Sequence, residues 1–206
     1  MASGKSAEAK AIEAQGPGNA DASDDGRMAP RVTLLLRTAK LTAGDREFLC
    51  IIRDVSATGI RLRLFHPLPE GATLVLETGN GDRYPLEPVW SYGENAGFRF
   101  LERINLGRLL KGPYEKFPKR QIRLRQALNG TIALANGPVD VTFENISQQG
   151  ACVKCDRHLA IDQMIVLKAG GLPPVQAKVR WRRRPHYGLI FEQTFQIEEL
   201  ARLLAP

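Results

Sequence analysis

Two hexapeptides of this 206-residue chain carry polar side chains and a glycine at the same spacing. They read DVSATG at 54–59 and NISQQG at 145–150, which is an offset of 91 residues. In a turn between strands, the side chains of the Asp or Asn and of the Ser accept hydrogen bonds from backbone N–H groups, and the Gly supplies a positive φ. The same groups could instead bind a small molecule, because a carboxylate accepts from the N1 and N2 donors of guanine and a hydroxyl bonds phosphate or sugar. The spacing alone is compatible with both uses.

An arginine pair lies upstream of the first hexapeptide, in RMAPR at 27–31. Side chains alternate along an extended segment, so Arg27 and Arg31 project to one side of it, and Pro30 favours extended geometry at Ala29. Guanidinium groups match the paired acceptors of phosphate and of the O6/N7 edge of guanine. A solvated basic flank at the edge of a domain is the alternative interpretation.

The hexapeptides belong to a longer internal repeat. At the same offset, the chain repeats an apolar triplet, a tryptophan, a glycine and a phenylalanine without a gap over about 45 residues. The matched pairs are LVL (74–76) and IVL (165–167), Trp90 and Trp181, Gly97 and Gly188, and Phe100 and Phe191. This self-similarity predicts a duplicated domain.

Each copy has the pattern of short β-strands. Segments such as FLCIIRDV and GIRLRLF in the first copy, and VDVTFENI and QAKVRWR in the second, are rich in branched residues and bounded by Gly, Asp or Pro. Closely spaced short strands favour a small antiparallel barrel over a parallel sheet with crossover helices. A helical pattern ends each copy, at 102–112 and 196–205, and the first stops at Gly112-Pro113.

These boundaries predict four segments. The tail at 1–26 is rich in Ala, Gly, Ser and Asp and lacks aromatic residues, so we expect it to be disordered. Domain 1 follows at 27–112, a linker at 113–118 and domain 2 at 119–206. The expected fold class is therefore all-β with short helices.

The conjunction of motifs closely resembles the PilZ domain family. It consists of an RxxxR arm, a first strand, D/NxSxxG after the second strand, a Trp-bearing strand and a hairpin that ends in GFRF, over about 27–110 and again over about 119–205. The resemblance implies two tandem six-stranded antiparallel β-barrels, each followed by a C-terminal helix, and binding of the bacterial second messenger cyclic di-GMP. The family's ligand-binding residues match Arg27, Arg31, Asp54, Ser56 and Gly59. The arginines are implied to fold over the ligand, and the loop to contact guanine and phosphate.

The second copy departs from the family pattern in its arm, PKRQIRLRQ at 118–126. Lys119 with Arg123 gives KxxxR, Arg120 with Arg123 gives only RxxR, and matching Arg123 to Arg31 requires a one-residue gap. Lysine neutralises phosphate but cannot bind guanine bidentately. The loop residues that do match are Asn145, Ser147 and Gly150. We therefore expect domain 1 to be the main site, and domain 2 to bind weakly, to bind only a shared ligand or to serve as a scaffold.

Further residues carry weaker chemical signals. RWRRRPH at 180–186 is expected at a hairpin tip, where it is solvated, adds to the ligand site or contacts an anionic partner. Trp90 and Trp181 are expected in the core or at the barrel rim, or lining the ligand pocket. Cys152 and Cys155 form a single CxxC whose thiols would face opposite sides of a strand, so we expect no metal site. The three histidines show no spacing that indicates catalysis, and we expect no catalytic residues.

The charge and composition of the chain limit the classes of protein to which it can belong. The formal charge is +7, and no apolar run approaches the length of a membrane span. The N-terminus lacks the apolar core of a secretory signal, and an odd count of three cysteines fits a reducing cytosol, so we expect a cytoplasmic protein.

The predicted function is that of a non-enzymatic cyclic di-GMP receptor without a further cofactor. Ligand binding would order the arm, rearrange the domains and thereby signal to a downstream protein partner. The alternative is a nucleotide-independent protein–protein adaptor built on degenerate barrels. Nucleic acid is a less favoured partner, because that hypothesis rests only on net charge and on the basic run, while most aromatic residues lie at core-like strand positions.

Overall fold

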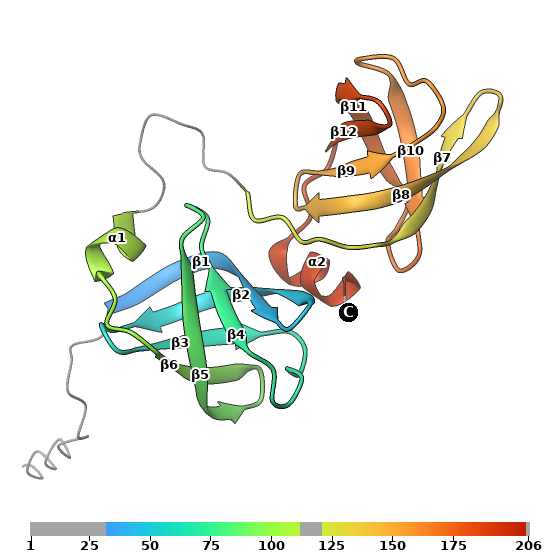
Figure 1. Cartoon of the computed structure of the whole chain (residues 1–206). Coiled ribbons are helices and arrows are strands. Elements are labelled where there is room, and N and C mark those ends of the chain that lie inside the picture. The colour runs from blue at the N-terminus through green and yellow to red at the C-terminus, as the bar shows by residue number, and fades with distance from the viewer. Residues whose placement is uncertain (1–31, 112–120, 205–206) are drawn as a thin grey trace, which may run out of the picture.

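The computed structural model describes residues 32–111 and 121–204. The first range folds into a closed antiparallel barrel, barrel 1, with strand order β1-β2-β3-β6-β5-β4 (Figure 1). Its strands are β1 (Val32–Ala43), β2 (Arg46–Val55), β3 (Gly59–Leu64), β4 (Leu74–Glu77), β5 (Arg83–Tyr92) and β6 (Asn95–Phe100). The predicted tail (1–26), the linker (113–118) and the arm residues Arg27, Arg31, Lys119 and Arg120 lie outside the described residues.

The second range folds into barrel 2, with strand order β10-β11-β12-β9-β8-β7. Its strands are β7 (Asn129–Leu134), β8 (Gly137–Ser147), β9 (Gly150–Lys154), β10 (Met164–Ala169), β11 (Val175–Arg183) and β12 (His186–Phe191). Pairing of β7 with β10 closes barrel 2, as pairing of β1 with β4 closes barrel 1. The two barrels share one topology, which confirms the predicted fold class.

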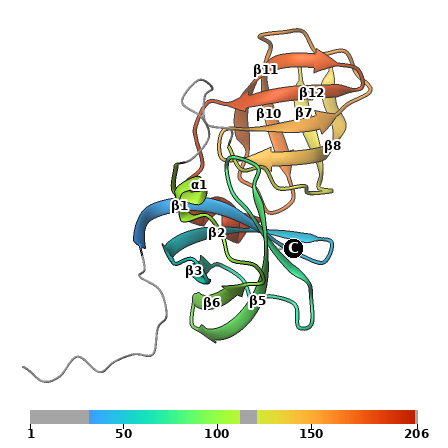
Figure 2. The same cartoon turned by 60° about the vertical axis from the view of Figure 1, so that its left-hand side comes forward.

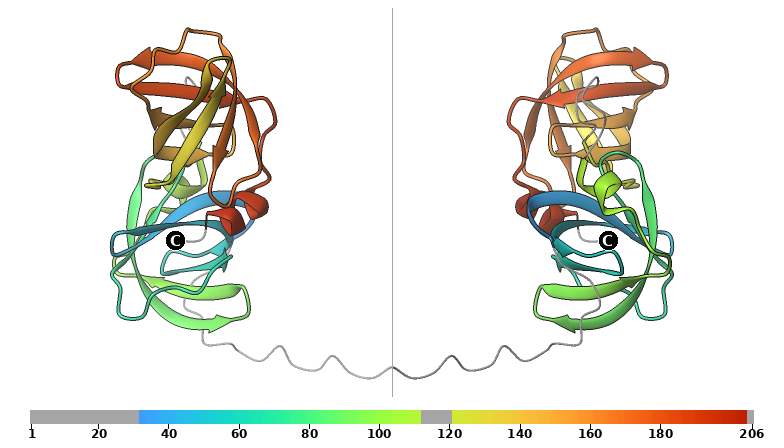
Figure 3. Two further views of the ribbon diagram at one scale, coloured as in Figure 1. Left: turned by 90° about the vertical axis from the view of Figure 1, so that its right-hand side faces the viewer. Right: turned by 90° about the vertical axis from the view of Figure 1, so that its left-hand side faces the viewer.

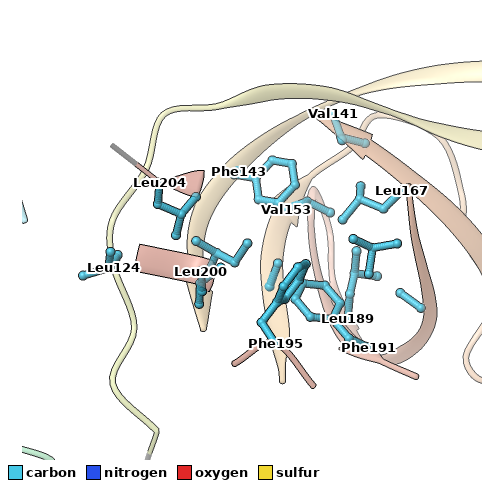
Figure 4. Packing of buried hydrophobic residues seen from close by; sticks show 14 of the residues in the cluster. Leu124, Val141, Phe143, Val153, Leu167, Leu189, Phe191, Phe195, Leu200 and Leu204 are labelled. Carbon is cyan, nitrogen blue, oxygen red and sulfur yellow. The ribbon is translucent and has the colours of Figure 1, made fainter. Parts of the chain in front are cut away.

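Strand alternation fills each barrel with apolar side chains. Inward residues of barrel 1 such as Leu41, Ile52 and Leu76 are almost fully buried. The barrel 2 core is built in the same way and gathers several aromatic rings (Figure 4). Among its buried members are Phe143, Val153, Leu167, Leu189, Phe191 and Phe195. Burial of this surface, at about 25 cal/mol per Å², is the main stabilising term for such small domains.

Strand β2 is buried on both of its faces. Phe48, Cys50 and Ile52 point into barrel 1, whereas the alternate residues Leu49 and Ile51 belong to the apolar cluster of barrel 2. The continuous apolar run FLCII therefore forms part of a core on one side and part of a junction on the other. The two barrels are joined by packed side chains as well as by the chain.

Two short helices follow the barrels, α1 (Leu106–Lys111) and α2 (Ile197–Leu203). Helix α1 begins later than the helical pattern at 102–112 predicts, because the Asn105 side chain accepts a hydrogen bond from the backbone N–H of Arg108 at 3.1 Å and so caps the helix there. Leu109 of α1 packs into the core of barrel 1.

Helix α2 lies between the two barrels (Figures 1 and 3). Its buried residues share one apolar cluster with residues of barrel 1, and His66 Nε2 lies 2.6 Å from the carbonyl oxygen of Ala201. The members of this shared cluster at the junction are Leu200, Ala201 and Leu204 at the C-terminal end and Leu49, Ile51 and Phe65 of barrel 1. The last helix of domain 2 thus packs against domain 1.

Four charged residues surround this contact, and we call them the latch: Arg63, Glu94, Glu198 and Arg202. Arg63 pairs with Glu94 at 2.7 Å and with Glu198 at 2.9 Å, and Arg202 pairs with the same two carboxylates at 2.5 and 3.1 Å. Both guanidinium groups also lie over the Phe65 ring, at 5.2 and 5.8 Å from its centroid. The latch therefore combines alternating charges with a cation–π stack across the junction.

No helix within the described residues is long and apolar enough to cross a membrane.

Candidate functional site

A β-bulge precedes the first residue of each hexapeptide. The register between strands shifts between Ile52 and Asp54 in barrel 1 and between Phe143 and Asn145 in barrel 2. A bulge re-aims the side chains that follow it and is common next to binding sites. The same irregularity therefore sets the direction of Asp54 and of Asn145.

The entry of the first strand fixes what lies beside each hexapeptide. Val32, the first residue of β1, pairs with Val55, and Leu124 forms a bridge with Ile146, the repeat equivalent of Val55. Val32 and Leu124 are therefore equivalent, and so are the residues that precede them in the sequence, Arg31 and Arg123. This register agrees with the one-residue gap that the sequence predicts.

In barrel 1, Ser56 organises the hexapeptide as a turn. Its Oγ accepts hydrogen bonds from the backbone N–H groups of Gly59 at 3.0 Å and Thr58 at 3.4 Å, and its backbone N–H donates to the carbonyl of Gly59 at 2.8 Å. Ser56 is 5% exposed, so its hydroxyl acts first as a structural group. The turn interpretation of this serine is correct, and the loop that it shapes presents Asp54.

Asp54 forms an ion pair that the sequence analysis did not anticipate. Its carboxylate lies 2.5 Å from Nε of Arg61, the residue opposite it on β3. The Asp54 side chain is 7% exposed and the Arg61 side chain 42%, so a buried carboxylate meets a guanidinium that also reaches the surface. In barrel 2 the corresponding pair is Asn145 opposite Cys152, which carries no charge.

In barrel 2, an arm arginine is in contact with the hexapeptide. Arg123 donates from Nη1 to Oδ1 of Asn145 at 3.2 Å, and the Ser147 hydroxyl donates to the carbonyl of Gly150 at 3.1 Å. Arg123, Asn145, Ser147 and Gly150 are therefore brought together as the motif predicts.

Both hexapeptide glycines serve a different purpose from the predicted one. Neither Gly59 nor Gly150 has a positive φ, so that expectation is wrong. A Cβ on Gly59 would lie 3.1 Å from the carbonyl oxygen of Phe98, and one on Gly150 would overlap the carbonyl oxygen of Leu189. The neighbouring strand passes so close that a side chain is excluded at Gly150 and is tight at Gly59.

A hollow of about 850 Å³ lies over the barrel 2 hexapeptide, and we call it the junction hollow. Barrel 1 contributes the turn between β4 and β5, which projects towards barrel 2 (Figure 2). Among its lining residues are Arg123, Arg125, Asn145, Ser147, Arg180 and Trp181 of barrel 2, and Lys40, Glu77, Thr78, Gly79, Asn80 and Gly81 of barrel 1. The loop, the arm and the basic hairpin of domain 2 therefore share one cavity with domain 1.

Each tryptophan lies on the outer face of its barrel, over a glycine of the neighbouring strand. Trp90 pairs with Gly97 and Trp181 with Gly188, and a Cβ on either glycine would overlap the indole ring. The indoles are 43% and 40% exposed, so the expectation of a core position is wrong. Trp181 lines the junction hollow, in agreement with the alternative that a tryptophan lines a pocket.

The basic run forms the β11–β12 hairpin, as predicted, and a register shift lies between Val179 and Trp181. Arg180 and Trp181 both line the junction hollow, so part of this run adds to the cavity. Cys155 belongs to the barrel core while Cys152 borders a second surface hollow, which matches the expected opposite directions. Within the ranges described, no three His, Cys, Asp or Glu side chains are grouped to hold a metal ion.

The chain matches a known domain family and is similar to several solved structures. The PilZ domain family matches residues 25–110 and 118–205. No curated protein sequence matches the chain. Solved structures similar to it include the PlzA protein of Borreliella burgdorferi in complex with c-di-GMP, with 11% identity over 82% of this chain and 88% of that one and a TM-score of 0.34.

Two further structures resemble the chain at the same level. The Inhibitor of motility of Bacillus subtilis (MotI/DgrA) is 14% identical over 82% of this chain and 94% of its own, with a TM-score of 0.35. The MrkH–c-di-GMP complex of K. pneumonia is 13% identical over 82% and 84%, with a TM-score of 0.31. The assignment rests on the family match, which spans both barrels. The chain belongs to the PilZ domain family, with one copy of the domain in each barrel.

Proposed function

We propose that this protein is a non-enzymatic receptor for cyclic di-GMP and that domain 1 holds most of the binding energy. The residues assigned to the ligand are Arg27, Arg31, Asp54, Ser56 and Gly59. The observation that carries the proposal is the register of β1. Its first residue, Val32, pairs with Val55 inside the hexapeptide, so the strand that directly follows the RxxxR arm in the sequence begins beside Asp54. The contact of Arg123 with Asn145 gives the equivalent arrangement in barrel 2.

The chemistry of the loop fits a guanine base. The carboxylate of Asp54 would accept hydrogen bonds from the N1 and N2 donors of guanine, and the guanidinium of Arg61, whose Nε lies 2.5 Å from it, would balance its charge. Arg27 and Arg31 supply paired donors for phosphate oxygens and for the O6/N7 edge of a base. Domain 1 is the better site because it has both arm arginines and an acidic loop residue, whereas domain 2 has Lys119 or Arg120 and the neutral Asn145.

Signal transmission would begin at the arm. Because the arm directly precedes β1, contacts with a bound ligand would order it against the barrel and change the surface presented to a downstream protein in the cytoplasm. Limited proteolysis near Arg27 tests this step: cleavage should slow when cyclic di-GMP is added. Equal cleavage rates with and without ligand would contradict arm ordering.

Calorimetric titration of cyclic di-GMP into Arg31→Ala and Arg123→Ala tests the assignment to domain 1. Loss of one bidentate contact costs about 1–3 kcal/mol, which corresponds to roughly ten- to a hundredfold in affinity. Arg31→Ala should weaken the tightest binding event by this factor, and Arg123→Ala should leave it unchanged. The reverse result would move the main site to domain 2, and absence of binding to the wild type would favour the adaptor function.

A further inference from the structure

The ion pair of Asp54 with Arg61 belongs to a row of residues that crosses barrel 1 from strand to strand. Each member is paired with the next on the neighbouring strand, in the order Asp54 (β2), Arg61 (β3), Gly97 (β6) and Trp90 (β5). Gly97 brings no side chain, and a Cβ there would overlap the indole of Trp90. The charges of this row are therefore those of Asp54 and Arg61.

The same row in barrel 2 carries no charge. It consists of Asn145, Cys152, Gly188 and Trp181, which are the repeat equivalents of the four residues. Burial raises the pKa of the Cys152 thiol above its ordinary value, so the thiol is neutral at physiological pH. The glycine and the tryptophan are kept, whereas the acid and the arginine are replaced together. Because a buried charge is costly without an opposite charge, this exchange indicates that the acid at position 54 depends on the arginine at position 61.

Other charged side chains near Asp54 come from each element that packs beside it. Most have contacts elsewhere or are exposed: Arg37 of β1 donates to the carbonyl of Leu109, Arg63 of β3 belongs to the latch, Arg99 of β6 pairs with Glu87 of β5 at 2.7 Å, and Glu102 and Arg103 are exposed. Arg53 lies at the bulge of β2 itself. In the proposed complex the arm arginines bind the ligand, so the charge of Asp54 is balanced from β3 by Arg61.

The protonation state of a carboxyl group decides which purine it fits. An ionised carboxylate only accepts hydrogen bonds, and guanine offers it two adjacent donors, N1 and N2. A protonated carboxyl group donates from its O–H and accepts at its other oxygen. Adenine matches this second pattern, because it presents an acceptor nitrogen beside its N6 amino donor. Any group that keeps the carboxylate ionised therefore favours guanine over adenine.

We propose that Arg61 is a specificity-determining residue, which keeps Asp54 ionised in the complex and thereby restricts the loop of domain 1 to guanine. The inference rests on the proposed function, since it concerns the same ligand site. It adds a residue that lies outside the RxxxR and D/NxSxxG motifs. Its effect is measured as a ratio of affinities for two ligands, which distinguishes it from a loss of binding.

The test is calorimetric titration of cyclic di-GMP and of cyclic di-AMP into the full chain at about pH 8 and about pH 5. In the wild type, the preference of the tightest binding event for cyclic di-GMP should be the same at both pH values. In Arg61→Ala it should fall about tenfold at the lower pH, because a buried carboxyl group without a facing cation binds a proton more readily. A purely structural role of Arg61 would weaken both ligands alike at both pH values.

Two control variants separate charge from shape. Arg61→Lys keeps the cation and should restore a preference that does not depend on pH. Arg99→Ala removes an arginine whose partner is Glu87, and its preference should also be independent of pH. A pH dependence in Arg99→Ala equal to that in Arg61→Ala would overturn the assignment to Arg61.

Asp54→Asn tests the same idea without leaving a buried charge, and the neutral Asn145 at the equivalent position shows that the fold accepts it. An amide has a donor and an acceptor, as a protonated carboxyl group does, so the preference for cyclic di-GMP should fall at both pH values. An unchanged preference in Asp54→Asn, or one independent of pH in a folded Arg61→Ala, would overturn the proposal while the receptor function stands. If the wild type does not bind cyclic di-GMP, both fail.

Discussion

At the scale of single residues, the position of Trp181 depends on the absence of a side chain at Gly188. The indole occupies the space that a Cβ of residue 188 would need, and it forms part of the junction hollow. In barrel 1 the equivalent Trp90 and Gly97 have the same contact. The two pairs therefore offer a matched comparison in which only the indole of Trp181 borders the junction hollow.

We predict that Gly188→Ala displaces the indole of Trp181 and lowers stability by about 1–3 kcal/mol, as overpacking does. In a Trp90→Phe background the tryptophan fluorescence comes from Trp181. Its emission should shift to longer wavelength, because the displaced indole is more exposed to water. Gly97→Ala, made in the protein that keeps Trp90, should destabilise barrel 1 to a similar extent, because its Cβ would overlap the Trp90 indole. An emission maximum unaffected by Gly188→Ala would contradict the stacked arrangement.

The site residues differ in how far the sequence could predict them. The D/NxSxxG residues follow from spacing and from the repeat, and the pairing of Arg123 with Asn145 follows once the one-residue gap is allowed. Arg61 was missed, because it meets Asp54 across a bulge that shifts the register by one residue. Arg180 was named only as part of the basic run, without its place beside Trp181 in the junction hollow. A β-bulge leaves no clear signal in a sequence of alternating polar and apolar residues. The side of the strand on which these arginines lie could therefore not be predicted from two-residue alternation.

At the scale of elements, α2 and its latch determine how the barrels meet. The guanidinium groups of Arg63 and Arg202 hold the pKa of the Glu94 and Glu198 carboxyls below the ordinary value of 4.5. Only the pairs that cross the junction, Arg202 with Glu94 and Arg63 with Glu198, link these pKa values to docking. Their contribution stabilises docking at pH values above 4.5 and is lost as the pH falls through the lowered pKa values.

Acidification should therefore separate the barrels before it unfolds them. We predict that the radius of gyration from small-angle scattering rises as the pH is lowered below about 4.5. Glu198→Gln should flatten this dependence, since it removes one titrating partner of both arginines. The matched control is Glu87→Gln, which breaks the exposed pair with Arg99 and should leave the dependence intact. A pH profile that is the same in wild type and Glu198→Gln would contradict the role of the latch.

Secondary structure was largely predictable, because short branched strands bounded by Gly, Asp and Pro show in the sequence. The junction was not predicted, although FLCII carries its signal: five consecutive apolar residues indicate a strand buried on both faces. Without a partner surface in view, the outer residues Leu49 and Ile51 gave no information on what covers them. The covering element, α2, comes from 146 to 154 residues further along the chain, beyond the reach of a local pattern.

At the scale of the whole molecule, one apolar cluster belongs to both domains. Leu109 and Leu200 are repeat equivalents and are buried to 2% and 1% exposure, but Leu109 packs only within barrel 1, whereas Leu200 packs in the shared cluster. Truncation of either should cost about 2–5 kcal/mol. The consequences should differ, because only α2 contributes to the junction.

We predict that Leu200→Ala increases amide hydrogen exchange in barrel 2 and also along β2 of barrel 1, where Leu49 and Ile51 lose their cover. Leu109→Ala should increase exchange in barrel 1 alone. Exchange measured by mass spectrometry on the intact chain separates these outcomes. Protection of β2 that survives Leu200→Ala would show that the two barrels are stabilised independently.

The receptor function itself is tested most directly by titrating cyclic di-GMP into the wild-type protein and repeating the titration with cyclic di-AMP. In the proposed site, Asp54 would accept from the N1 and N2 donors of guanine, and the arm arginines would donate to its O6/N7 edge, whereas adenine presents neither arrangement. The account predicts saturable binding of cyclic di-GMP that is at least about tenfold tighter than that of cyclic di-AMP. Equal affinities, or no heat with cyclic di-GMP, would contradict it.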